Sequence, residues 1–212
     1  MYPHTLLKKS LLAVSFALLT LPAVTAADSV KLMSNISNAY DCYLAAQFSI
    51  LMRAPSNEDI EACTRAIRME KLSKSGLAKT YTNRGVLRKI MHRNSSALRD
   101  YYRARSLGGE TPELNVNIGN IAYAEKRYEK ALRYYDKALR MNMRNEFIAH
   151  VNRGLVNERL GDLDAAIEDY RAALVTNPEL DLARERLELI QFGDARLPNQ
   201  ENSELLAAVA HF

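Results

Sequence analysis

Residues 152–178 read NRGLVNERLGDLDAAIEDYRAALVTNP, and the spacing within this stretch decides the fold. A glycine is followed at fixed intervals by an alanine, a tyrosine and a second alanine, and the same four residue types occur twice upstream at the same intervals. The three sets are Gly85, Ala97, Tyr101 and Ala104; Gly119, Ala131, Tyr135 and Ala138; and Gly154, Ala166, Tyr170 and Ala173. The chain therefore contains an internal repeat.

Each repeat is predicted to be a pair of antiparallel helices. A glycine inside a helix costs about 1 kcal/mol relative to alanine, so three in register indicate backbones that must approach closely. We expect the first alanine to face the glycine across the hairpin, and the tyrosine and second alanine to pack against the next hairpin. The tyrosine hydroxyls are expected to reach the surface. The predicted helices span residues 78–91, 95–107, 112–125, 128–141, 147–160 and 163–175.

This pattern resembles the tetratricopeptide repeat, most closely over residues 152–178 with Gly161-Asp162 at the turn between the helices. The resemblance implies an all-α fold, a right-handed superhelical solenoid of helix-turn-helix repeats at about 78–111, 112–146 and 147–178. The sequence departs from the family where Arg88, Ala122 and Asn157 replace a large aromatic residue, and where the turn at residues 92–94 lacks glycine. We expect these departures to change local packing and not the fold.

After the third repeat, residues 178–192 are predicted to form a C-terminal capping helix that covers the last apolar face. Its apolar stripe comprises Leu180, Ala183, Leu187 and Ile190. Residues 193–212 follow as a polar linker and a short apolar tail from Ser203 to Phe212. The tail could fold back onto the solenoid, dock into a neighbouring molecule or fray, and we favour folding back.

Residues 1–26 have the composition of an export signal peptide. Lys8 and Lys9 form a positive segment, residues 11–21 form an apolar core, and residues 24–26 (Val-Thr-Ala) offer small side chains for cleavage. The apolar run is shorter than the roughly 20 residues that span a bilayer, which argues against the alternative of an uncleaved anchor. We therefore expect a periplasmic or secreted protein that begins after Ala26 and has no later membrane-spanning segment.

The net charge does not indicate a nucleic-acid partner. The chain has 29 basic and 25 acidic residues, and the predicted leader contains two of the lysines and no acid. A nucleic-acid-binding protein concentrates Lys and Arg on one face, whereas here they alternate with Asp and Glu along the predicted helices. We interpret these charges as solvated helix surfaces.

Upstream of the first full repeat, residues 27–77 are predicted to contain a degenerate helical hairpin. Ser56 and Asp59 resemble a capping box that opens its second helix. In an antiparallel pair centred on Gln47 and Asp59, Cys42 falls nearly opposite Cys63. An even number of cysteines in an exported chain favours a disulfide, worth roughly 3 kcal/mol for a loop of this length in the entropic description. Two buried free thiols or a metal-binding pair are the alternatives.

The resemblance implies a concave face, lined by the first helix of each repeat, as the place for a bound peptide. Two residues before each glycine stands an asparagine, Asn83, Asn117 or Asn152, whose amide is able to bond a peptide backbone. Alternatively, these asparagines bond only to a neighbouring helix. The complete predicted groove is Lys79, Thr82, Asn83, Val86, Lys89, Val116, Asn117, Asn120, Tyr123, Ile148, Val151, Asn152, Leu155 and Arg159.

Some relatives in this family hold the C-terminal carboxylate of a peptide with a set of lysine, asparagine and arginine side chains. Lys79, Asn83 and Asn117 match three members of that set. The third helix has Ile148 and Asn152 where two cations are needed, so charge-assisted capture of a carboxylate loses most of its driving force. We therefore predict a groove for an extended or helical peptide and not a dedicated carboxylate clamp.

The sequence contains no arrangement of residues that indicates catalysis. The histidines at positions 4, 92, 150 and 211 have no serine, cysteine or carboxylate at a spacing typical of a catalytic base and its partner. No phosphate-binding loop, dinucleotide glycine pattern or metal-ligand spacing is present, so no cofactor or metal is expected. We predict a non-enzymatic adaptor of the cell envelope that binds a segment of a partner protein. The alternative is a scaffold that forms homo-oligomers through the ends of the solenoid or through the tail.

Overall fold

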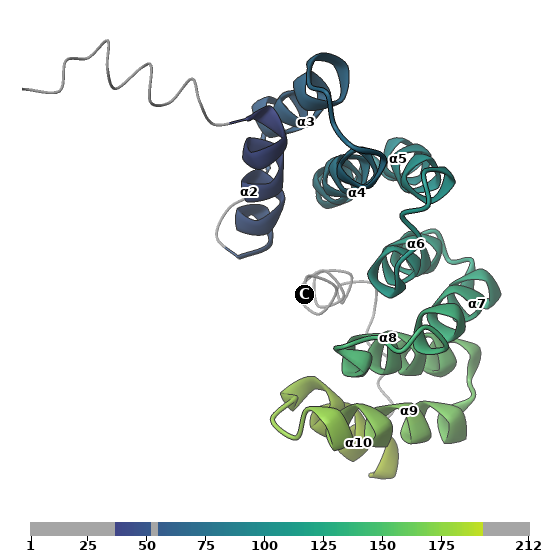
Figure 1. Ribbon diagram of the computed structural model, residues 1–212. Helices are drawn as coiled ribbons and strands as arrows, with labels where there is room; N and C mark the ends of the chain where they lie inside the picture. Colours follow the sequence, from purple (N-terminus) through teal and green to yellow (C-terminus); the bar gives the residue numbers. More distant parts are fainter. Residues whose placement is uncertain (1–36, 52–54, 193–212) are drawn as a thin grey trace, which may run out of the picture. The chain divides into compact units, whose positions relative to one another are not determined.

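The computed structural model describes residues 37–51 and 55–192, and the secondary structure in these ranges is α-helical (Figure 1). The helices are α2 (Asn38–Leu51), α3 (Asn57–Met69), α4 (Lys74–Ile90), α5 (Asn94–Ser106), α6 (Pro112–Ala124), α7 (Tyr128–Leu139), α8 (Glu146–Leu160), α9 (Leu163–Thr176) and α10 (Asp181–Gln191). The predicted leader, linker and C-terminal tail lie outside the described residues. No described helix is long and apolar enough to cross a membrane.

Consecutive helices pack as hairpins, α2 with α3, α4 with α5, α6 with α7 and α8 with α9, and α10 packs on α9. The helix bounds agree with the predicted ones to within about two residues, except that α4 begins at Lys74 and not near residue 78. This earlier start arises because Ser73 is an N-cap. Its hydroxyl accepts a hydrogen bond from the Gly76 amide at 3.0 Å and so satisfies a free N–H of the first turn.

The repeated glycines make room for the repeated tyrosines. A Cβ atom on Gly119 would lie 2.6 Å from Cε1 of Tyr135, well inside normal contact distance. The same pairing joins Gly85 to Tyr101 and Gly154 to Tyr170. The nearest contact of each glycine is the tyrosine and not the first alanine expected to face it, because the three atoms nearest to each added Cβ all belong to the tyrosine ring. A planar ring can lie directly against the facing helix only where that helix carries no side chain.

The prediction that the tyrosine hydroxyls reach the surface is also wrong. Tyr101, Tyr135 and Tyr170 are each 0% exposed. The hydroxyl of Tyr135 donates to Oδ1 of Asn120 at 2.7 Å, and that of Tyr170 donates to the carboxylate of Glu158. Two of the three hydroxyls are thus satisfied inside the protein by polar side chains of the helix that carries the glycine, as burial requires.

The first hairpin is held by a pair of buried cysteines. The sulfur atoms of Cys42 on α2 and Cys63 on α3 lie 2.09 Å apart, and both residues are 0% exposed. The predicted capping box is confirmed, since Ser56 and Asp59 bond to each other's backbone N–H at the start of α3. Gln47, expected at the centre of the helix contact, is instead exposed, because the buried face of α2 runs through Cys42 and its apolar neighbours.

We predict that Gly119→Ala destabilises the protein by about 1–3 kcal/mol, because the added methyl overlaps the ring of Tyr135. Urea denaturation of the single variants, the double variant with Tyr135→Leu, and the parent chain tests this contact. In the double variant the overlap is gone, so its loss of stability is expected to be smaller than the sum of the two single losses. Additive losses would show that the glycine is not there to accommodate the ring.

Candidate functional site

The predicted groove residues divide into an accessible set and a buried set. On α4, Lys79 is exposed, and Thr82, Asn83, Val86 and Lys89 are partly exposed, although the amine of Lys89 is itself buried. Arg159 on α8 is also partly exposed. The remaining ones are buried and are Val116, Asn117, Asn120 and Tyr123 on α6 and Ile148, Val151, Asn152 and Leu155 on α8. The accessible part of the predicted surface is therefore mostly on α4.

The buried groove residues pack against one another. Val116 and Tyr123 of α6 belong to the same apolar cluster as Ile148, Val151 and Leu155 of α8, so these side chains hold the α6–α7 and α8–α9 hairpins together. Burying aliphatic side chains in this way stabilises each by about 1.5–3 kcal/mol. Their role in the described structure is the stacking of hairpins.

The three asparagines do not form a continuous accessible row. Asn152 is 0% exposed, and its Nδ2 donates to Oδ1 of Asn120 at 3.0 Å, so it bonds to a neighbouring helix as the alternative interpretation expected. Asn117 is 8% exposed. Asn83 keeps accessible surface, and its side chain has no hydrogen bond to another described residue. Of the three, Asn83 is the one whose amide is available to a ligand.

Three of the accessible predicted residues lie at a cavity beside α4. The cavity has a volume of about 560 Å³ and includes Lys79, Thr82 and Asn83. Its other lining residues are Lys74, Ser75 and Ala78 from α4 and Leu107, Gly108, Gly109 and Thr111 from the connection between α5 and α6. The lining carries two lysine amines, hydroxyls and an amide, with a backbone wall of two glycines. This composition suits a peptide segment that offers carbonyl or carboxylate oxygens.

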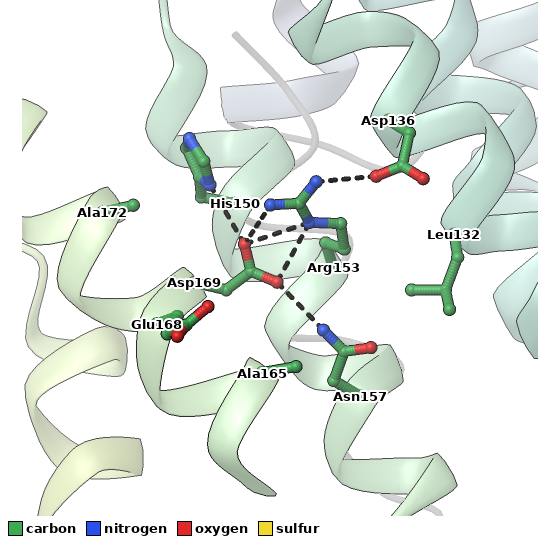
Figure 2. A pocket seen from close by; sticks show the side chains of 9 residues that line it. All are labelled: Leu132, Asp136, His150, Arg153, Asn157, Ala165, Glu168, Asp169 and Ala172. Carbon is green, nitrogen blue, oxygen red and sulfur yellow. Dashed lines mark hydrogen bonds and ion pairs between the residues drawn. The ribbon is translucent and has the colours of Figure 1, made fainter. Parts of the chain in front are cut away.

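Sequence reasoning missed a buried polar cluster between α8 and α9 (Figure 2). The carboxylate of Asp169 accepts hydrogen bonds from Arg153 at 2.7–3.1 Å and from Asn157 at 3.0 Å, and it also contacts His150 Nδ1 at 3.1 Å. Arg153 extends to Asp136 on α7 at 2.6 Å. Burial lowers the pKa of Arg153, but the hydrogen bonds to the two carboxylates outweigh it and raise the pKa. The cluster therefore links the α6–α7 hairpin to the α8–α9 hairpin.

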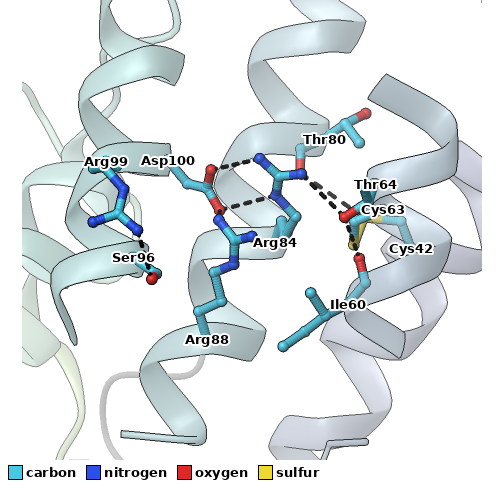
Figure 3. Close-up of polar contacts among 10 residues, drawn as sticks. All are labelled: Cys42, Ile60, Cys63, Thr64, Thr80, Arg84, Arg88, Ser96, Arg99 and Asp100. Carbon is cyan, nitrogen blue, oxygen red and sulfur yellow. Dashed lines mark hydrogen bonds and ion pairs between the residues drawn. A yellow bond between two sulfur atoms is a disulfide. The ribbon is translucent and has the colours of Figure 1, made fainter. Parts of the chain in front are cut away.

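A matching cluster joins the first hairpin to the second one (Figure 3). Arg84 of α4 donates to both oxygens of Asp100 on α5 at 2.8–3.0 Å and to the Thr64 hydroxyl of α3 at 3.1 Å. Arg88 adds a second ion pair to Asp100 at 2.6 Å. Arg84 and Arg153 each precede the repeat glycine, and Asp100 and Asp169 each precede the repeat tyrosine. This pairing of positions is the signal in the sequence that indicates both clusters.

A third buried group fixes α10. Arg186 is 5% exposed and donates to the carboxylate of Glu158 on α8, which also accepts the Tyr170 hydroxyl. Burial lowers the pKa of Arg186, but its bonds to Glu158 raise it above the usual value. The predicted capping helix is thus anchored by a buried ion pair as well as by its apolar face.

Comparison with known proteins identifies the arrangement. A tetratricopeptide-repeat family model matches residues 91–145 and 116–181. The crystal structure of MamA aligns with a TM-score of 0.55 at 17% identity, over 72% of this chain and 84% of MamA. The crystal structure of YrrB, described as a TPR protein with an unusual peptide-binding site, aligns with a TM-score of 0.55 at 18% identity, over 89% and 92% of the two chains. This is a tetratricopeptide-repeat fold.

One human relative agrees with this result. Tetratricopeptide repeat protein 6 of Homo sapiens is 32% identical over 83 residues, which are 39% of this chain. The chain spans 16% of the length of that relative. In tetratricopeptide terms, α4 to α9 are three helix pairs, α2 and α3 form a fourth pair upstream, and α10 follows as a single helix.

We predict that Asp169→Asn lowers the free energy of unfolding by about 2–3 kcal/mol, because Arg153 loses its buried carboxylate partner and keeps only the ion pair with the more exposed Asp136. Asp136→Asn is the matched control. The Asp136 side chain is 40% exposed, so its loss is expected to cost less than about 1 kcal/mol. Equal losses of stability in the two variants, measured by urea denaturation, would contradict the assigned role of Asp169.

The buried amine of Lys89 is expected to make the free energy of unfolding depend on pH. Burial lowers the pKa of its amine from 10.5 to about 8, and its Nζ has no hydrogen-bond partner in the described structure. Below pH 8 the folded chain must hold this charge in a buried site, so Lys89→Met is expected to stabilise the fold by roughly 3 kcal/mol. The gain should shrink from about pH 8 towards 10.5, where only the unfolded lysine stays protonated. Thermal melts across this range measure it, and a gain that does not change with pH would refute it.

Proposed function

We propose that this chain is a non-enzymatic adaptor of the cell envelope that binds a segment of a partner protein at the cavity beside α4. The observation that carries the proposal is that Lys79, Thr82 and Asn83 line one cavity with the connection between α5 and α6. Lys79 and Asn83 have no hydrogen bond or ion pair with another described residue, so their polar groups are available to a ligand.

The fold supports a binding role. A stack of helix pairs exposes long helix faces that are able to hold an extended segment. YrrB, which has the same fold at 18% identity, is described as having a peptide-binding site. Here the accessible residues are concentrated on the first full repeat, so we place the peptide site there and not along all three repeats.

The location in the envelope is part of the proposal. It is supported by the leader-like composition of residues 1–26 and by the pair of buried cysteines. We propose that this pair is an oxidised disulfide in the cell, as is typical of exported proteins. Labelling with a thiol-reactive reagent after denaturation, with and without prior reduction, tests whether the two cysteines are oxidised. N-terminal sequencing of the exported chain tests whether the leader is removed.

A self-associating scaffold is the second candidate, and exposed apolar side chains at both ends of the helix array favour it. At the first helix Tyr40 is 51%, Tyr43 46% and Phe48 51% exposed. After α10, Phe192 is 84% exposed. Light scattering over a range of protein concentrations discriminates the candidates, because the adaptor is expected to remain monomeric and the scaffold to gain mass.

Photo-crosslinking in living cells tests the adaptor proposal. A photoreactive amino acid at Thr82 is expected to trap a partner, whereas the same group at exposed Arg99 on α5 is the control and is expected to trap none. Adding Lys79→Glu and Asn83→Ala should lower the yield at Thr82 by about tenfold, because two polar contacts with the segment are lost. Equal yields at both positions, or an unchanged yield after the two substitutions, would refute the site.

A further inference from the structure

A second charged surface lies at a cavity that shares no lining residue with the cavity beside α4. Arg105 at the end of α5 and Lys130, Arg133, Tyr134 and Lys137 of α7 line a cavity of about 310 Å³, which we call the basic notch. Four of these five residues are cations, and none is an acid. The alternation of basic and acidic residues along the sequence predicts solvated helix surfaces, and this concentration of cations departs from that prediction.

The cations of the basic notch are largely unpaired. Lys137 forms an ion pair with Glu110 at 2.6 Å. Arg105 stacks over the ring of Tyr102 at 4.9 Å. No described carboxylate pairs with Arg105, Lys130 or Arg133. Their charges are therefore available to an anionic ligand.

The arrangement costs stability and is not explained by helix formation. Lys130, Arg133 and Lys137 follow one another on one face of α7 at intervals of three and four residues. Like charges at these intervals destabilise a helix by about 0.2–0.5 kcal/mol per pair. Lys137 and Arg105 are in the last turns of their helices, where cations are favourable, but Lys130 and Arg133 are not.

The equivalent place in the next repeat has a different composition. The cavity between α7, α8 and α9 in Figure 2 contains Ala165, Glu168, Asp169 and Ala172, which lie 35 residues after the four residues that α7 gives to the basic notch. Its arginine and histidine are held by Asp169 and Asp136. Equivalent positions in the repeat therefore do not require cations, and the cations of the basic notch are specific to this pair of repeats.

The surroundings favour an acidic protein segment as the ligand. A membrane surface would engage apolar side chains as well as cations, and no exposed large apolar side chain in the described chain lies on α5, α6 or α7. The cations line a small hollow next to Tyr102 and Tyr134, which suits single carboxylate side chains on a narrow chain. Arginine in particular pairs with carboxylates through two parallel hydrogen bonds.

We propose that the basic notch, formed by Arg105, Lys130, Arg133 and Lys137 between α5 and α7, binds an acidic segment rich in Asp and Glu from a partner protein. This site is separate from the cavity beside α4 and does not depend on the function proposed for that cavity. Binding there is driven by charge, so it weakens as salt is added.

Fluorescence anisotropy with the purified chain tests the proposal. The probe is a short fluorescein-labelled peptide of alternating Glu and Gly, and a peptide of alternating Gln and Gly is the neutral reference. The variant is Lys130→Glu with Arg133→Glu. The matched control is Lys71→Glu with Arg171→Glu, two exposed cations on other parts of the chain, which changes the net charge by the same amount. Circular dichroism melts check that both variants fold.

We expect the acidic peptide to bind and the neutral one not to bind. The Kd should rise at least about tenfold in the basic-notch variant and less than about twofold in the control variant. Equal weakening in both variants, or no binding of the acidic peptide, overturns the proposal. Two other results would overturn the proposal because each would identify a different ligand. One is co-sedimentation with phosphatidylglycerol vesicles without peptide binding, and the other is self-association of the chain that is lost in the basic-notch variant.

Discussion

The contact between a tyrosine ring and a glycine of the facing helix is the interaction on which the rest of the structure depends. It occurs once in each of the three full repeats and leaves no room for a Cβ atom. It brings the two helices of a hairpin close, and it buries the largest side chains of the core. Because the ring is buried against the facing helix, its hydroxyl is withdrawn from water, and in two of the three repeats it bonds to a side chain inside the protein.

Those partners also help to join one hairpin to the next. The Tyr135 hydroxyl bonds to Asn120, which in turn accepts from Asn152 of the following hairpin. The Tyr170 hydroxyl shares Glu158 with Arg186 of α10. A hydrogen bond needed inside one repeat is thus extended to its neighbour, so closing a hairpin and stacking two hairpins are parts of one network.

The sequence was sufficient to predict the features that depend on local spacing. The recurrence of glycine and tyrosine identified the helix pairs, and Ser56 with Asp59 identified the start of α3. Features that depend on contacts between repeats were not predictable in the same way. The burial of Asn152 depends on how α8 stacks on α6, and the accessibility of Asn83 depends on the connection after α5. Identical residues in identical repeat positions therefore have different environments.

The residues next to the constant glycine and tyrosine differ from repeat to repeat, so the repeats are not interchangeable. The position before the glycine is Arg84, Ile118 or Arg153, and the position before the tyrosine is Asp100, Tyr134 or Asp169. Arginine with aspartate forms a buried ion pair that reaches back to a polar residue of the preceding hairpin, Thr64 or Asp136. Isoleucine with tyrosine instead packs against Tyr102 of the preceding hairpin. If two repeats were exchanged, a buried arginine would lie against an apolar surface, at a cost of several kcal/mol.

The difference between the repeats also bears on the cations of α7. The core positions of α7 form no buried ion pair, so the cations of this helix are available at the basic notch. Structural and surface roles are in this way assigned to different repeats of one chain.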